Sequence, residues 1–325
     1  MSHDPSANRR DVLKLAGAAS LATLGTALPS AAEAAAPMMG VLRPSIYRFK
    51  LGEFEITNFL DGFLERPPHP TYAGNLPAEK VAELAKANGV SATKFEHVYV
   101  NTLVNTGKEL VLFDTGNGKS RDPNLGKLQA LLAEAGYKPE QVDLVVITHG
   151  HPDHINGLVD ADKPAYPNAR YIFGEAEFDF WKKGENVREA RKANREQFVK
   201  VAVPLAEKST FVKNEGEVVG GIRAIPTFGH SPGHMSYHVE SQGQRLLIWG
   251  DVSNHYIFSI QQPEWQASFD DDKDAAIATR KRVFDMVATD KLPVVGYHLP
   301  FPALGFVERA GTSYRWVPAG NQFNV

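Results

Sequence analysis

Residues 142 to 158 read VDLVVITHGHPDHINGL, and in this stretch an apolar run ends abruptly in potential metal ligands. Leu144 to Ile147 are all aliphatic, which is typical of a strand that is buried on both faces. Four potential ligands then follow within six residues: His149, His151, Asp153 and His154. Gly150 and Pro152 between them favour a turn over a continued strand. We therefore expect a loop at a strand end that directs several donor atoms at one place.

Three later apolar runs also end in a histidine or a carboxylate. They lead to Gly229-His230-Ser231-Pro232-Gly233-His234, to Gly250-Asp251 and to Tyr297-His298. A single buried histidine is more often part of a core than a ligand, but four strand ends of this type are hard to explain by packing. Four or five histidines with two carboxylates exceed the ligand set of one tetrahedral zinc. They suit two metal ions that share a carboxylate and a bridging water.

Asp114 and the acidic stretch at 269 to 274 each have more than one interpretation. Asp114 closes an earlier strand, 109 to 114. Its carboxylate either orients a ligand histidine through the ring nitrogen that does not bind metal, or bonds its own backbone in a turn. The acidic stretch FDDDKD, 269 to 274, precedes a helix expected from Ala275 to Ala288. We expect these acids to cap that helix and offset its dipole, rather than to form a calcium loop.

The order of the expected elements predicts an α/β fold with ligands at the carboxyl ends of strands. Alternation from Tyr47 to Phe59 predicts a hairpin, and an amphipathic helix from Leu125 to Ala135 leads into the strand before the histidine loop. Another helix is expected from Ile155, with Asp153 and His154 at its start. A long charged helix is expected over 186 to 203.

Composition narrows the classes of partner and of metal ligand. With 325 residues, 43% of them hydrophobic and 10% aromatic, the chain suits an ordinary globular protein. The formal charge of -3 and the lack of a basic block argue against a nucleic-acid partner, so a small molecule is expected. The chain has no cysteine, which excludes disulfides and thiolate metal ligands.

The amino-terminal residues have the pattern of an export signal. Arg9-Arg10 precedes an Ala/Gly-rich apolar segment, 15 to 28, and small residues at 32 to 36 offer an A-x-A cleavage site. This resembles a bacterial twin-arginine signal. The alternative is a membrane anchor, but the apolar run is shorter than the ~20 residues that span a bilayer. We expect residues 1 to 36 to be read by the twin-arginine export machinery. Residues 37 to 325 would then form a single catalytic domain, periplasmic or secreted and without stable membrane insertion.

The motif T-H-x-H-x-D-H at 148 to 154, with the later G-H-x-P-G-H, G-D and histidine, resembles the pattern of the metallo-β-lactamase superfamily. The resemblance extends over residues 45 to 320 and implies a four-layer αββα sandwich, with two mixed sheets packed face to face and helices outside. It implies that one metal takes His149, His151 and His230. The other would take Asp153, His154 and His298. Asp251 would bridge the two, and His234 would support the ligands or pack beside them.

Several segments resemble the methyl parathion hydrolase group more closely: LGEFEIT, VLFDTG, EAEFDFW and H-x-x-F-P-x-x-G at 298 to 305. That group comprises exported dinuclear hydrolases of organophosphate triesters, aryl esters or lactones. Gly150 and Arg121 depart from its pattern, which leaves the substrate open. The pocket wall is expected to include Trp181, Phe178, Tyr72 and Phe301, although such aromatic clusters are more often core. His69, His97, His238 and His255 are assigned surface or structural roles.

The main expectation is a dinuclear hydrolase in which a metal-bridging hydroxide cleaves phosphotriesters or activated carboxylic esters. The catalytic residues would be Asp251, Asp153 and His298, with the substrate oxygen polarised by the metal that Asp153 and His298 hold. A lactonase or arylesterase is the first alternative, and an iron-dependent persulfide dioxygenase or a glyoxalase II-like thioesterase comes after it. Two zinc ions are expected, although manganese, cobalt and iron suit the same ligands. A homodimer remains an open alternative.

Overall fold

The computed structural model describes residues 36 to 320, and the expected export signal lies almost wholly outside them. The described chain divides into residues 36 to 42 and a unit that begins at Arg43, and the latter holds every described helix and strand. Within the described part, no helix has the length and apolar character that crossing a membrane requires.

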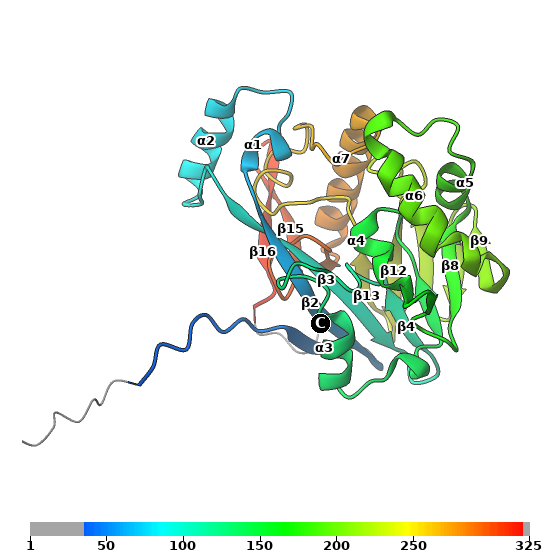
Figure 1. Ribbon diagram of the computed structural model, residues 1–325. Helices are drawn as coiled ribbons and strands as arrows, with labels where there is room; N and C mark the ends of the chain where they lie inside the picture. Colours follow the sequence, from blue (N-terminus) through cyan, green and yellow to red (C-terminus); the bar gives the residue numbers. More distant parts are fainter. Residues whose placement is uncertain (1–35, 321–325) are drawn as a thin grey trace, which may run out of the picture. The chain divides into compact units, whose positions relative to one another are not determined.

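Two seven-stranded mixed sheets form the centre of this unit (Figure 1). The first has the order β1 (Ile46–Leu51), β2 (Phe54–Arg66), β3 (Phe95–Asn105), β4 (Leu110–Phe113), β5 (Leu144–Val146), β8 (Arg170–Gly174) and β9 (Ser209–Val212). The second has the order β10 (Gly216–Val219), β11 (Ile222–Pro226), β12 (Met235–Ser241), β13 (Gln244–Ile248), β14 (Val294–Val295), β15 (Leu304–Ala310) and β16 (Ser313–Pro318). A separate ribbon pairs β6 (Val159–Asp160) with β7 (Lys163–Pro164).

Helices cover the outer faces of both sheets. Apolar side chains of the two sheets meet in a shared core, where Ile56 and Val146 of the first sheet pack with Tyr237 and Ile248 of the second. The outer face of the first sheet packs against α3 (Leu128–Glu134), α5 (Glu175–Lys183) and α6 (Lys192–Val201). That of the second packs against α7 (Lys273–Asp290). The predicted αββα sandwich is therefore confirmed.

The parallel strands bring the polar loops to one edge. In the first sheet β4, β5 and β8 run parallel, and in the second β13 runs parallel to β14. All three residues of β5 are fully buried, as its unbroken apolar run predicts. The carboxyl ends of parallel strands lie at the same edge of a sheet, so the residues after these strands can gather there.

Two helix predictions were wrong. The helix expected from Ile155 is instead α4 (Pro152–Ile155), which ends where it was expected to begin. It gives way to a 3-10 turn, Asn156–Leu158, in which Gly157 lies so close to Thr115 that an added Cβ would be 2.0 Å from its carbonyl oxygen. The long helix expected over 186 to 203 is shorter, because a separate 3-10 turn, Glu189–Arg191, precedes α6.

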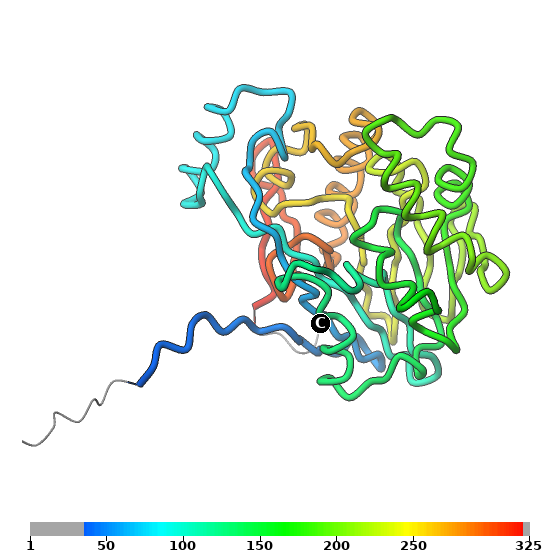
Figure 2. The backbone as a smooth tube through the Cα atoms, viewed as in Figure 1, coloured from blue at the N-terminus to red at the C-terminus, as the bar shows by residue number. Residues whose placement is uncertain are grey.

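A smaller apolar cluster joins the segment after β2 to a later loop. Helices α1 (Pro68–Thr71) and α2 (Ala78–Ala87) follow β2. Tyr72 and Val81 of this segment pack against Ile257, Phe258 and Trp265. In Figure 2 the cyan segment accordingly lies beside the gold loop. This contact holds one wall beside the edge where the ligands gather.

Candidate metal centre

Three histidine nitrogens converge at the end of β5. The Nε2 atoms of His149 and His230 each lie 3.0 Å from Nδ1 of His151. All three side chains are buried, and the three form one of the groups whose ligand atoms lie within 4.8 Å of one another. His230 comes from the loop after β11, 79 residues or more from the other two, so the two sheets must pack together before this group exists.

A second group forms beside the first. Asp153, His154 and His298 also place their ligand atoms within 4.8 Å of one another. Asp251 follows β13 and lies between the two groups. One carboxylate oxygen, Oδ2, is 3.2 Å from Nε2 of His230 and 3.0 Å from Nε2 of His298. The other, Oδ1, is 3.3 Å from Nε2 of His154. This central position suits a carboxylate that two metal ions share.

Every one of the five histidines has its outer ring nitrogen held by an oxygen. The pairs are His149 Nδ1 with Thr148 Oγ1 (3.1 Å), His151 Nε2 with Asp271 Oδ2 (3.3 Å), His154 Nδ1 with Asp114 Oδ2 (2.8 Å), His230 Nδ1 with Asp270 Oδ1 (2.9 Å) and His298 Nδ1 with the Val98 carbonyl (2.7 Å). An N–H that donates outward leaves the lone pair of the inner nitrogen pointing into the centre. This is the arrangement that metal-binding histidines require.

Two buried atoms at the centre test whether a metal ion fits. His154 Nε2 and Asp251 Oδ1 are buried and have no hydrogen-bond partner among the described residues. A buried polar atom without a partner costs about 1–3 kcal/mol, so such atoms usually indicate a missing ion or water. Both atoms face the convergent nitrogens. The residues therefore fit a dinuclear centre of nitrogen and oxygen ligands.

The pKa shifts of His154 and Asp251 also indicate a site for cations. Burial opposes protonation of His154, but the carboxylates of Asp251, Asp153 and Asp114 together raise its pKa well above the ordinary value. Burial likewise opposes ionisation of Asp251, yet His298, His154 and His230 hold its pKa well below the usual range. The carboxylates thus favour a positive charge at this place, which divalent cations would supply.

Asp114 orients a ligand histidine, which is the first of the two roles expected for its carboxylate. It follows β4 with a left-handed φ of 57°. Its Oδ2 accepts from His154 Nδ1, and its Oδ1 accepts from the Thr148 backbone N–H at 2.8 Å. The Thr148 hydroxyl donates to the same carboxylate at 2.8 Å. One carboxylate therefore positions both the start of the histidine loop and its last ligand.

The interpretation of the acidic stretch 269 to 274 as caps needs correction. Only Asp272 caps α7 with its side chain, accepting from the Ala275 backbone N–H. Asp270 is fully buried and accepts from His230 and from Nη2 of Arg280 at 2.8 Å. Asp271 accepts from His151, and also from Arg188 and Arg191. The sequence offered no signal for this, because a run of acids before a helix is equally explained by capping.

Glu177 is a positioning residue that the sequence did not reveal. It lies on α5, is 1% exposed and accepts four hydrogen bonds. Its Oε1 takes the Gly150 N–H and the Trp181 Nε1–H, both at 2.7 Å. Its Oε2 takes the Ser231 hydroxyl and the Gly233 N–H, both at 2.8 Å. A single buried carboxylate therefore joins the two histidine loops. The segment EAEFDFW drew attention to its aromatic residues and gave no signal for this carboxylate.

His234 supports a ligand and does not face the centre. Its Nε2 accepts from the Asp251 backbone N–H at 2.9 Å, so its lone pair is engaged. Its Nδ1 lies 2.8 Å from the Thr227 hydroxyl. The side chain thereby fixes the backbone of Asp251. His97, which was given a surface or structural role, is buried and stacks on His298 with ring centroids 4.0 Å apart.

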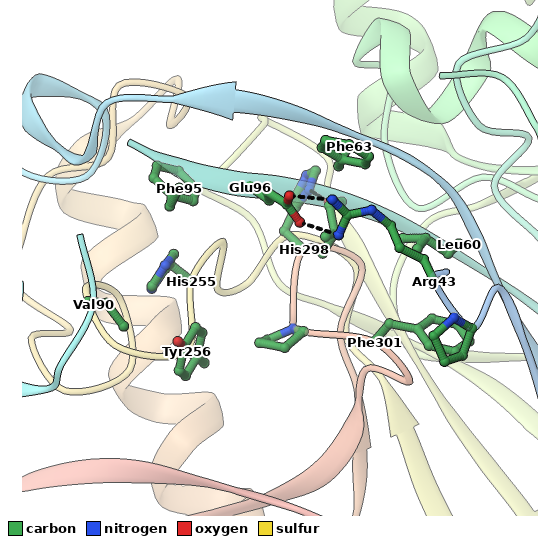
Figure 3. Close-up of a pocket in the computed structure, with 13 residues that line it drawn as sticks. Arg43, Leu60, Phe63, Val90, Phe95, Glu96, His255, Tyr256, His298 and Phe301 are labelled. Atoms are coloured by element: carbon green, nitrogen blue, oxygen red, sulfur yellow. Dashed lines mark hydrogen bonds and ion pairs between the residues drawn. The ribbon is translucent and has the colours of Figure 1, made fainter. Parts of the chain in front are cut away.

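Three of the four residues expected in the pocket wall lie in the core instead. Phe178 and Trp181 pack in the core under α5 and α6, because Trp181 fills the space beside Gly150 and donates to Glu177. Tyr72 is 1% exposed and belongs to the smaller apolar cluster. Phe301 does line a cavity, of about 440 Å³, together with Phe95, Tyr256 and His298, as Figure 3 shows.

A second cavity, of about 370 Å³, opens directly onto the ligands. It reaches His151, Asp153, His230, Asp251 and His298. Its remaining wall combines polar and apolar side chains: Leu64, Arg66, His97, Tyr99, Asn117, Pro152, Asn156, Arg191, Asn194 and Phe269. This cavity is where a substrate would meet both metal positions. The 440 Å³ cavity shares only His298 with it.

Comparison with known proteins gives a consistent result. A sequence model described as the metallo-beta-lactamase superfamily matches residues 98 to 295. An N-acyl homoserine lactonase from Bacillus cereus is 25% identical over 169 residues, which are 52% of this chain and 60% of that protein. The chain thus spans less than two thirds of the length of this curated relative.

Two solved structures are similar over most of their length. The hydrolase AbOPH, of the beta lactamase superfamily, has a TM-score of 0.78 and 28% identity, covering 86% of this chain and 98% of its own. AidC, a dizinc quorum-quenching lactonase, has a TM-score of 0.76 and 28% identity, covering 84% and 97%.

Proposed function

The chain belongs to the metallo-β-lactamase superfamily, and we propose that it is a dinuclear metal-dependent hydrolase of carboxylic esters, lactones included. The observation that carries this proposal is the set of five buried histidines whose outer nitrogens are all held by oxygens. Five inward lone pairs around one central carboxylate have no use in a core. They have an immediate use as ligands of two metal ions.

The residues divide the work between the two positions. His149, His151 and His230 would hold one ion, Asp153, His154 and His298 the other, and Asp251 both. Two divalent ions in these places would supply hydroxide at neutral pH and polarise the substrate oxygen. Asp153 has the most exposed side chain of the acids in the centre, at 26%, which leaves its ion open to the cavity. Asp114, Asp270, Asp271 and Glu177 hold the ligands in place during turnover.

The comparisons favour a carboxylic ester or lactone over a phosphotriester. The similar proteins include an N-acyl homoserine lactonase and the lactonase AidC. Phosphotriester cleavage is the second candidate, because several segments resemble the methyl parathion hydrolase group.

Zinc is the proposed metal, as in AidC.

Export through the twin-arginine route is also part of the proposal. The support for export is the Arg9-Arg10 pair and the small residues before position 37. Fractionation of cells that express the full chain, with and without Arg9→Lys and Arg10→Lys, would detect it. Retention of both forms in the cytoplasm would contradict it.

The function is tested by metal content and turnover measured together. The purified protein should bind close to two metal ions and hydrolyse a panel of phenyl acetates and acyl lactones, with paraoxon as the phosphotriester. Asp251→Ala should lose turnover and metal, because the central carboxylate is removed. His238→Ala alters a half-buried histidine outside the centre and is the matched control. Full activity with normal metal content in Asp251→Ala would refute the proposal. Oxygen uptake with a persulfide would indicate a redox enzyme instead.

A further inference from the structure

The cavity over the metal centre is lined by a cation, Arg66. Arg66 is the last residue of β2 and lines the 370 Å³ cavity. No carboxylate among residues 36 to 320 forms an ion pair with it, and its Nε is buried without a hydrogen-bond partner. The side chain of Arg66 hydrogen-bonds the hydroxyl of the neighbouring Tyr99.

The other arginine of this cavity is already engaged. Nε of Arg191 donates to Asp271 at 2.8 Å, and its Nη2 donates to the Phe269 carbonyl. The two carboxylates that line the cavity, Asp153 and Asp251, belong to the metal centre. Two divalent ions would more than offset their charge. Arg66 is thus the cavity cation that has no carboxylate partner among residues 36 to 320.

The guanidinium is also held in position. Its central carbon lies 5.5 Å from the centroid of the Phe269 ring, a cation–π contact that restricts its orientation. Leu64 and His97, which are paired across β2 and β3, extend the wall from Arg66 towards His298. A planar fork that is held by its neighbours matches a carboxylate or phosphate with two parallel hydrogen bonds.

We propose that Arg66 binds an anionic group of the substrate, so that the preferred esters or lactones carry a carboxylate or phosphate besides the bond that is cleaved. The inference rests on the proposed function and narrows its substrate class. Arg66 touches the substrate away from the reacting bond, so it determines specificity and leaves the hydrolytic step to the metal centre.

The test compares esters that differ by one charge. 4-Acetoxybenzoate carries its charge on the leaving group, and monophenyl adipate carries it on the acyl group. The methyl ester of each compound is its neutral counterpart. In Arg66→Gln, KM for at least one charged ester should rise about 10- to 100-fold, the usual effect of losing a charge-assisted hydrogen bond. The neutral esters should change less than about twofold, and kcat should be maintained. Arg66→Lys should recover part of the loss.

Lys94→Gln is the matched control. Lys94 forms an ion pair with Glu65, the residue before Arg66, but its side chain is 66% exposed and lies outside the cavity. Removing its charge changes the same region of the surface without touching the wall. Unchanged metal content and melting temperature in all three variants would show that folding is intact. Equal KM changes for charged and neutral esters, or equal effects in Lys94→Gln, would overturn the inference.

Equilibrium binding separates this inference from the proposed function. The dissociation constant of 4-acetamidobenzoate, the amide analogue, is measured by tryptophan fluorescence for the wild type and Arg66→Gln. Weaker binding to the variant, with no ester hydrolysed by any form, would retain the anion site and refute the hydrolase. Hydrolysis of every ester without dependence on Arg66, together with unchanged binding, would retain the hydrolase and refute the anion site.

Discussion

Asp270→Asn is the most informative substitution outside the ligand set. The carboxylate is fully buried and accepts one hydrogen bond from His230 and one from Arg280, which is itself 1% exposed. Asparagine keeps the shape but replaces one acceptor by an N–H₂ group. Because asparagine is neutral, the buried Arg280 loses its counter-ion whichever way that group faces. If it faces His230, the imidazole must change tautomer and direct an N–H at the metal position.

The cost follows from these contacts. Breaking a buried ion pair costs about 3–5 kcal/mol. Arg280 also donates to the carbonyls of Val252, Pro263 and Trp265, which places the expected loss near the lower end, about 3 kcal/mol. Loss of a carboxylate behind a ligand histidine typically weakens metal binding about 10- to 100-fold. Zinc-loaded protein should therefore lose about 1.4–2.8 kcal/mol more than metal-free protein.

Two measurements check this prediction. Urea unfolding of the metal-free protein gives the loss of stability, and competition with a chelator gives the zinc dissociation constant. Asp272→Ala is the control two residues away, since Asp272 is exposed and only caps α7. It should cost about 1 kcal/mol and leave zinc binding unchanged. If Asp270→Asn costs no more than Asp272→Ala and binds zinc as the wild type does, the assigned role of Asp270 is wrong.

Two further predictions concern the histidine loop and the response to pH. Gly150→Ala would place a Cβ 2.5 Å from the buried ring of Trp181, so we expect a loss of about 1–3 kcal/mol in urea unfolding and weaker zinc binding; wild-type values for both would contradict this. Burial lowers the pKa of His255 to about 3, whereas the pKa in the unfolded chain is about 6.5. The stabilisation from the neutral form is therefore complete above pH 6.5 and is lost as the pH falls from 6.5 to 3. Between pH 7 and pH 5 the wild type should lose about 2 kcal/mol more than His255→Asn in urea unfolding, and equal losses would show that His255 is not buried as a neutral group.

The sequence alone predicted the strand ends and the candidate ligands that follow them, because both depend on local patterns, and the resemblance to the metallo-β-lactamase superfamily added the sandwich. A run such as Leu144 to Ile147 can only be a buried strand or a short core segment, and the turn residues after it decide where it ends. Histidines directly after such runs lie at strand ends in any arrangement of the sheets. The hairpin at 47 to 59 was predicted for the same reason, since alternation and its turn are encoded in neighbouring residues.

Only the tertiary structure decided which side chains support those ligands and which line the cavity. Asp271 lies 120 residues from His151, and Glu177 lies 54 residues from Ser231, so no local pattern links either pair. The aromatic residues of α5 were equally suited to a core or a pocket, and the packing of Trp181 against Gly150 placed it in the core. Arg66 ends a strand whose last residues could face either side. Contacts between distant segments fixed these positions, because hydrophobicity determines that a side chain is buried but not what it is buried against.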